Sequence, residues 1–364
     1  MLLACVLCAC GDLRPPPEVK VVEAHEVGVL PQSPLIIGRD GGDSALVWGH
    51  SVWAFGDTVL SVPDADGVTW HHNSFSASDD LDGEDGVTWL PERVDSAGAP
   101  RYLIAPTAEE EAFNAAHRGD PCVEPPCGAR WAAWPGAPVF DEARSRALIP
   151  YGLIYAEPGD FNFHGVGQSF AVWTDYATLP ERPVVATAQD HSTLLFLENE
   201  PGYGDGGSAI VGDDLYAFAC RPSCKLGKVP LDHVFERAAW TYWDGAAWSA
   251  RIGDARALFA APYARVGYND SLGRWTAVYA EDLSDHVVMR TAPDLTGPWS
   301  APAGLFTADR KGTGGWTYDA YPHAEYAGEG GRVQFVSFTR SNGQGWFGSE
   351  LVWVRVLIEP APHP

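Results

Sequence analysis

Short apolar runs alternate with polar turns along most of this chain. The clearest unit spans residues 44–55, where two apolar runs flank a polar turn, and a second copy spans residues 208–218 after a one-residue gap. Alternating β-branched and aromatic residues favour pleated strands, whereas Gly and Asp favour tight turns. Each copy therefore predicts a β-hairpin.

Weaker copies of this hairpin follow the same pattern. They cover residues 139–155, 265–279 and 324–338, with polar turns at 141–144, 269–273 and 328–331. Further strands are predicted between the hairpins, at 169–174, 239–243, 286–291 and 350–357. A hairpin with two outer strands has the four strands of a propeller blade. The repeats predict an all-β fold, a single five-bladed β-propeller over residues 35–358, followed by a tail at 359–364.

Composition agrees with an all-β fold. The 364 residues include 39 Gly, 29 Pro, 15 Trp and 13 Tyr, which suit turns and pleated strands better than helices. No apolar stripe of helical period lasts for three turns, and the one helix-like stretch, 108–116, is expected to be a short insertion. The first repeat is the longest, so we expect long loops there on one face, where functional residues concentrate.

The net charge of the chain and its N-terminal residues indicate which partners and which cellular location to expect. A formal net charge of −24 argues against nucleic acid as a partner, because it would repel a phosphate backbone. Residues 1–10 are apolar and too short to span a bilayer, which needs about 20 residues, and they end in Leu7-Cys8-Ala9-Cys10, which resembles a bacterial lipobox. We expect acylation of Cys10, a Pro-rich tether and lead-in at 11–34, and export as an outer-membrane or cell-surface lipoprotein held only by this anchor. A plain secretory signal is the alternative.

The other four cysteines form two local pairs. Two neighbouring pairs in an exported protein predict two small-loop disulfides, Cys122–Cys127 and Cys220–Cys224. A zinc site made of all four thiolates is the alternative, although the loops contain prolines rather than the usual zinc-binding spacing.

Two acidic residues flank the first hairpin. Asp40 precedes its first strand, and Asp57 ends its second strand. Antiparallel pairing would bring these ends together and place both carboxylates at one rim of the central channel. Glycoside hydrolysis needs such a pair, because one acid protonates the leaving oxygen while the other attacks the sugar or activates water. The competing interpretation is that both residues belong to ordinary turns without a catalytic role.

Several sequence motifs carry a family resemblance. They are Asp40–Gly42, Trp53–Thr58, Asn73–Asp79, Ala239–Trp248, Arg290–Pro293, Gly297–Ser300 and Tyr321–His323. In these motifs the sequence resembles a family of five-bladed propellers known as a domain of unknown function, some of whose members are endo-D-arabinanases.

The resemblance implies roles for individual residues. Asp40 and Asp57 match the paired acids of the family, and Asn73 and His323 match positions expected to contact sugar. Where many relatives carry a Glu, this chain has Arg265, which we expect to pair with a substrate carboxylate or with a catalytic Asp.

Further candidates depend on residue type alone. Arg39 beside the channel, His164 before a strand and Tyr321 as a stacking platform are candidate substrate-binding residues. Each of these side chains also suits an ordinary structural role.

Three functions remain open at this point. The first is a glycoside hydrolase, and the second is a non-catalytic propeller that binds glycan or protein. A sialidase-like enzyme is the third, but it needs three channel arginines, and only Arg39 and Arg265 are well placed. We expect a monomer that binds a polysaccharide or oligosaccharide without a metal or other cofactor; calcium held by Asp40, Asp43 and Asp205 is the alternative.

Overall fold

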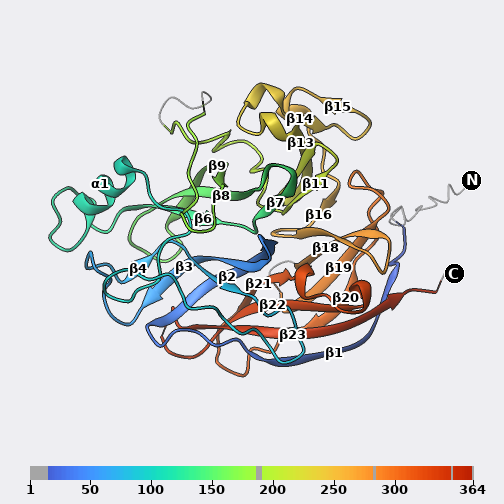
Figure 1. Ribbon diagram of the computed structural model, residues 1–364, viewed down its shortest axis with the longest axis horizontal. Coiled ribbons are helices and arrows are strands. Elements are labelled where there is room, and N and C mark those ends of the chain that lie inside the picture. Colours follow the sequence, from blue (N-terminus) through green and yellow to red (C-terminus); the bar gives the residue numbers. More distant parts are fainter. Residues whose placement is uncertain (1–14, 186–190, 282–283, 346, 363–364) are drawn as a thin grey trace, which may run out of the picture.

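The computed structural model describes residues 15–185, 191–281, 284–345 and 347–362. Cys10, the expected acylation site, lies outside these residues. Five antiparallel sheets follow one another along the chain, as the colours of Figure 1 show from blue to red. The fold is the predicted five-bladed β-propeller. Among the described residues, no helix has the length and apolar character needed to cross a membrane.

Each blade is one sheet. Blade 1 contains β2 (Ile36–Val47), β3 (His50–Leu60), β4 (Trp70–His71) and β5 (Ser74–Ser78). Blade 2 contains β6 (Arg130–Pro135), β7 (Val139–Asp141), β8 (Arg146–Ala156), β9 (Phe163–Trp173) and β10 (Phe196–Leu197). Blade 3 contains β11 (Ser208–Val211), β12 (Asp214–Cys220), β13 (Ser223–Pro230), β14 (Thr241–Trp243), β15 (Trp248–Ser249) and β16 (Phe259–Ala260).

The last two blades complete the ring. Blade 4 contains β17 (Arg265–Asn269), β18 (Arg274–Ala280), β19 (His286–Ala292) and β20 (Ala303–Thr307). Blade 5 contains β21 (Thr317–Pro322), β22 (Val333–Ser341), β23 (Ser349–Pro360) and β1 (Val19–Val29). The inner strands surround the axis, because β2 packs against β7 and β21, β7 against β11, and β11 against β17.

The hairpin prediction is confirmed in four blades, whereas in the fifth the inner strand lies earlier in the chain than predicted. The turn at 328–331 exists, but the inner strand of blade 5 is β21, at Thr317–Pro322, rather than a strand beginning at 324. Short 3₁₀ turns occupy Ala324–Tyr326 and Glu329–Gly331. The polar stretch between β21 and β22 therefore belongs to the connection, which the hairpin pattern did not separate from the strand.

The ring is closed by a strand from the start of the chain. Strand β1 pairs antiparallel with β23, from Val19 opposite Pro360 to Val29 opposite Val352. Figure 1 shows blue β1 running beside red β23. The structure thus places residues 19–29 in the propeller rather than in the lead-in predicted at 11–34, and β23 continues two residues beyond 358. Most of β1 is exposed, so its sequence lacks the buried face that would have identified a strand.

The hydrophobic core consists of clusters between adjacent blades. Blades 1 and 2, 2 and 3, 3 and 4, 4 and 5, and 5 and 1 each share one cluster of buried side chains. Fully buried tryptophans anchor several of them, namely Trp53, Trp173, Trp240 and Trp353. Because every cluster needs two neighbouring blades, no blade buries its apolar faces alone.

Two features of the insertions also match the sequence. Helix α1 (Ala108–His117) begins at Thr107, whose side chain caps the helix while Glu110 bonds back to the Thr107 amide. Disulfides join Cys122 to Cys127 and Cys220 to Cys224. The four sulfurs are therefore not available as a zinc-binding thiolate set.

Removal of residues 1–29 should destabilise the whole propeller, because it exposes the edge of β23 and deletes the backbone hydrogen bonds of β1. Net contributions of about 1 kcal/mol per hydrogen bond predict a loss on the order of 3–5 kcal/mol in the free energy of unfolding. Urea denaturation measures it, and the matched control lacks only residues 1–14. Equal stability of the two truncated proteins would contradict a closing role for β1.

Candidate active site

Asp40 and Asp57 lie within the two strands of the first hairpin rather than at their ends as predicted, and they meet at an interruption in the strand pairing. The β2–β3 register pairs Arg39 with Thr58 and then Gly41 with Phe55, so Asp40 alone lies opposite Gly56 and Asp57. Such a bulge turns side chains out of the regular alternation. A methyl group on Gly56 would lie 3.6 Å from the Asp40 Cβ, so the glycine leaves space beside Asp40.

The carboxyl group of Asp40 is half-buried and faces other acids. The Tyr318 hydroxyl donates a hydrogen bond of 2.5 Å to its Oδ1. Burial, together with the nearby charge of Asp57, raises the pKa of Asp40 to about 8, although the Tyr318 hydrogen bond opposes the shift. Asp40 therefore retains its proton at neutral pH.

Asp57 has a different set of neighbours. Burial raises its pKa as well, but the charge of Arg130 and a hydrogen bond from the Trp134 indole favour the ionised form. The Trp134 Nε1 donates to Asp57 Oδ1 over 3.2 Å. Arg130 also lies over the Trp70 ring, with its guanidinium carbon 4.3 Å from the ring centroid. These contacts make Asp57 the better candidate for the ionised member of the pair.

Asp319 is a third acid at this site, and the sequence analysis did not identify it. It lies in a bulge of β21 between Tyr318 and Tyr321 and has a left-handed backbone, with φ of 55°. Burial raises its pKa, while a hydrogen bond to Tyr321 and the charge of Arg265 oppose the shift. The sequence predicted the blade 5 strand to begin at residue 324, after Asp319. Only the neighbouring tyrosines, Tyr318 and Tyr321, could have indicated that Asp319 belongs to the site.

Arg265 does reach the channel, but it pairs with a different acid from those expected. Its Nε lies 2.5 Å from Asp43 Oδ2, and its guanidinium carbon lies 4.4 Å from the centroid of the Tyr321 ring. Burial lowers the pKa of Arg265, but the charge of Asp43 and its hydrogen bond to the guanidinium raise it by more, so the group stays charged. Arg265 is thus held by Asp43 rather than by Asp40 or Asp57.

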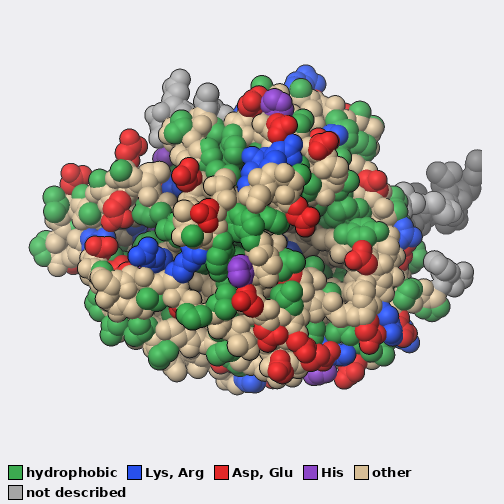
Figure 2. Space-filling model, viewed as in Figure 1, with side chains coloured by type: hydrophobic (Ala, Val, Ile, Leu, Met, Phe, Trp, Pro, Cys, Tyr) green, Lys and Arg blue, Asp and Glu red, His purple; other side chains and the backbone are tan. Residues whose placement is uncertain are grey.

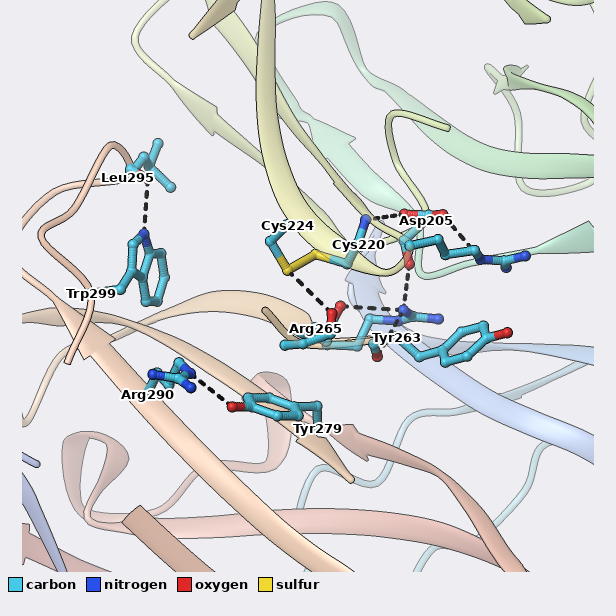
Figure 3. Close-up of a disulfide and its surroundings, with 12 residues drawn as sticks. Asp205, Cys220, Cys224, Tyr263, Arg265, Tyr279, Arg290, Leu295 and Trp299 are labelled. Atoms are coloured by element: carbon cyan, nitrogen blue, oxygen red, sulfur yellow. Dashed lines mark hydrogen bonds and ion pairs between the residues drawn. A yellow bond between two sulfur atoms is a disulfide. The ribbon is translucent and has the colours of Figure 1, made fainter. Parts of the chain in front are cut away.

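The second disulfide helps to position Arg265. A terminal nitrogen of Arg265 donates to the backbone carbonyl of Asp205, whose carboxylate accepts the Cys220 amide at 2.7 Å. Figure 3 shows Asp205 between the Cys220–Cys224 hairpin and Arg265. Arg221 pairs with Asp205 over 3.1 Å.

Three of the predicted substrate-binding residues are buried and contact other parts of the protein. Arg39 pairs with Glu92 over 3.3 Å and lies over the Phe55 ring. Asn73 accepts the amides of Leu103 and Ile104 and donates to backbone carbonyls, so it ties separate segments together.

His323 is the third of these residues. Its Nδ1 bonds to Ser44 over 2.6 Å, its Nε2 bonds to Ser337 over 2.8 Å, and its ring stacks on Trp53. Burial lowers the pKa of His323 well below its usual value, so the ring stays neutral. Both ring nitrogens are therefore used inside the protein.

The last two candidates lie at the edges of the site. Tyr321 is buried between Asp319 and Arg265. His164 is exposed on β9 and packs against Tyr155, while the preceding residue, Phe163, packs against Trp134. Since successive side chains of a strand point to opposite faces, His164 faces away from Asp57.

Two of the three acids named for the calcium alternative are paired with arginines. Asp43 binds Arg265 and Asp205 binds Arg221, so neither carboxylate is free to join Asp40 around an ion. Within the described part of the chain, no three His, Cys, Asp or Glu side chains form a metal-binding group.

A separate hollow lies away from these acids. It has a volume of about 340 Å³ and is lined by Arg93, Val94, Arg101 and residues 177–179. The Arg93 guanidinium there donates to the carbonyls of Tyr176 and Thr178. The residues that line this hollow include no pair of acids that could catalyse hydrolysis.

Comparisons with known proteins agree with this architecture. Residues 214–339 match the model of the family described as Domain of unknown function (DUF4185). This segment covers blades 3 to 5 in large part and does not include Asp40 or Asp57. No match to a curated protein was found.

Solved structures share the fold at low sequence identity. A "putative hydrolase" from Bacteroides ovatus ATCC 8483 superposes with a TM-score of 0.60 at 14% identity, over 89% of this chain and 87% of that one. An exo-beta-1,3-galactanase from Phanerochaete chrysosporium, with beta-1,3-galactotriose, gives a TM-score of 0.50 at 10% identity, over 92% of this chain and 64% of the galactanase. The DUF4185 match and the five-bladed fold confirm that this chain resembles the propeller family known as a domain of unknown function.

Proposed function

We propose that this protein is a glycoside hydrolase that cleaves a polysaccharide with Asp40 and Asp57. The observation that carries the proposal is the bulge that sets Asp40 opposite Gly56 and Asp57 while both carboxylates stay half-buried. Two acids in one partly desolvated site match the requirement of glycosidic bond cleavage.

The surroundings of the two acids assign their roles. Asp40, whose pKa burial raises to about 8, donates its proton to the glycosidic oxygen as the bond to the anomeric carbon breaks. Asp57, which Arg130 and Trp134 hold toward the charged form, attacks the anomeric carbon or takes a proton from the attacking water. Water supplies the hydroxyl of the new reducing end.

The substrate class follows from the family resemblance. Endo-D-arabinanases in the resembled family favour a furanose-rich, arabinan-type polysaccharide, and the galactanase of similar fold supports a carbohydrate ligand. A cell-surface lipoprotein anchored at Cys10 would meet such polymers outside the cell. The sialidase alternative loses support, because Arg39 and Arg265 are occupied by Glu92 and Asp43.

Replacement of Asp40 or Asp57 by Asn should lower hydrolysis of soluble arabinan by about 10²–10⁴-fold, because each variant lacks one half of the acid pair. Release of reducing sugar measures the rate. Asp270→Asn, in an exposed turn of blade 4, is the matched control and should retain wild-type activity. Equal rates in all four proteins would remove both acids from catalysis, whereas binding without hydrolysis would favour a non-catalytic propeller.

The pH dependence should have an alkaline limb near pH 8. Asp40 must carry its proton to act as the acid, and its pKa is about 8, so kcat/KM should fall as the pH rises through this value. Initial rates on soluble arabinan between pH 5 and pH 10 (about half-unit steps) test this. A rate that stays constant up to pH 10 would exclude Asp40 as the proton donor.

Asp40→Asn should stabilise the fold at alkaline pH. The pKa of Asp40 is about 8 in the folded protein against an ordinary 3.8, so the wild type loses stability as the pH rises between these values, whereas the variant does not. At about pH 9 we expect an advantage on the order of 5 kcal/mol in the free energy of unfolding, and at about pH 4 no difference. Urea denaturation at both pH values measures it, and a less stable variant at the higher pH would refute the burial argument.

A further inference from the structure

Two large aromatic side chains from different blades meet at the surface beside the acids. Phe161 lies in the β8–β9 turn of blade 2 and is 68% exposed, and Trp316 directly precedes β21 of blade 5 and is 45% exposed. Their ring centroids lie 6.0 Å apart, with an interplanar angle of 44°. Blades 2 and 5 are the two neighbours of blade 1, so this contact spans the blade that carries Asp40 and Asp57.

One side of the contact leads to Asp57. Asp57 accepts a hydrogen bond from Trp134, and the Trp134 ring packs edge-on against Phe163 at a centroid distance of 5.0 Å. Phe161 precedes Phe163 by two residues in a tight turn. Phe161 is therefore linked through the backbone of this turn to Phe163, which packs against the Trp134 that binds Asp57.

The other side leads to Asp40. Tyr318 donates its hydroxyl hydrogen to Asp40, and Trp316 precedes Tyr318 by two residues in the same segment. Asp40 and Asp57 influence each other electrostatically. The Phe161–Trp316 contact therefore joins the segment of blade 2 next to Asp57 to the segment of blade 5 next to Asp40.

The exposure and backbone of Phe161 argue for a ligand. Phe161 has a left-handed backbone, with φ of 56°, which is unfavourable for a bulky residue and tends to persist where function requires it. Exposed aromatic faces are apolar surfaces that water solvates poorly, so such patches often mark binding sites. The negative face of an aromatic ring attracts the C–H groups on one face of a sugar.

The charges around the site favour a neutral sugar. Arg39 is paired with Glu92, and Arg265 with Asp43. Both arginines are therefore already paired with carboxylates of the protein, and the charge of Arg130 acts on Asp57. Elsewhere, acidic side chains gather along the lower edge of the face in Figure 2, over β1 and β23. An anionic glycan would therefore be repelled.

We propose that Phe161 and Trp316 form an aromatic bridge that binds a sugar unit of a neutral polysaccharide beside the unit held at Asp40 and Asp57. This inference rests on the proposed hydrolase for its placement beside the cleavage point. The bridge uses stacking rather than charge, so it recognises the glycan without a paired cation.

Binding should be measured with the Asp57→Asn protein, in which the polymer is not consumed. The probes are soluble arabinan, xylan and galactan as neutral polymers and polygalacturonate as the anionic one. Phe161→Ala and Trp316→Ala should each raise the Kd for the neutral polymer that binds by about tenfold, and Trp316→Phe should restore most of the affinity. Tyr268→Ala, an exposed aromatic on β17, is the control and should leave the Kd unchanged.

Kinetics with Asp57 intact separate binding from chemistry. Phe161→Ala and Trp316→Ala should raise KM by about tenfold with kcat changed by less than about twofold. Unchanged Kd and KM in both variants, tighter binding of polygalacturonate than of any neutral polymer, or binding of no polymer would each overturn the bridge. If the wild type hydrolyses none of the polymers but its Kd still depends on Phe161 and Trp316, the hydrolase fails and the bridge stands.

Discussion

Two carboxyl groups, Asp40 and Asp57, share a half-buried space in the first blade, where a bulge interrupts the regular pairing of β2 with β3. Charged acids in such a place repel each other and lose their hydration. Burial, and after it the charge of Asp57, raises the pKa of Asp40 to about 8, so one member of the pair keeps its proton. Asp319 on blade 5 adds to the repulsion, so the proton balance of the site depends on two blades.

The remainder of the fold holds this unfavourable arrangement in place. Five apolar clusters lock neighbouring blades together, and strand β1 closes the ring against β23. Around the acids, buried cations are already matched to other carboxylates, as in Arg265 with Asp43 and Arg39 with Glu92. Because those pairs neutralise each other, they stabilise the channel without removing the mutual influence of Asp40 and Asp57.

Sequence reasoning succeeded where a local pattern carries the information. Repeated strand–turn–strand units predicted the propeller, and closely spaced cysteines predicted both disulfides. It failed where the environment decides the role of a side chain. Asn73 and His323 look like sugar-binding residues in their motifs, yet both have their hydrogen bonds satisfied by other parts of the protein.

The amino-acid sequence by itself determined the repeat, the five blades and the placement of Asp40 and Asp57 on the two strands of one hairpin, because hydrophobic periodicity and turn residues act locally. Only the tertiary structure decided which acids face each other, which arginines are already occupied, and that Asp319 and the Phe161–Trp316 pair lie beside them. Those relations join blades 1, 2 and 5, whose residues are far apart in the chain. They arise when the ring closes and brings blades 1 and 5 together, and no local pattern encodes that contact.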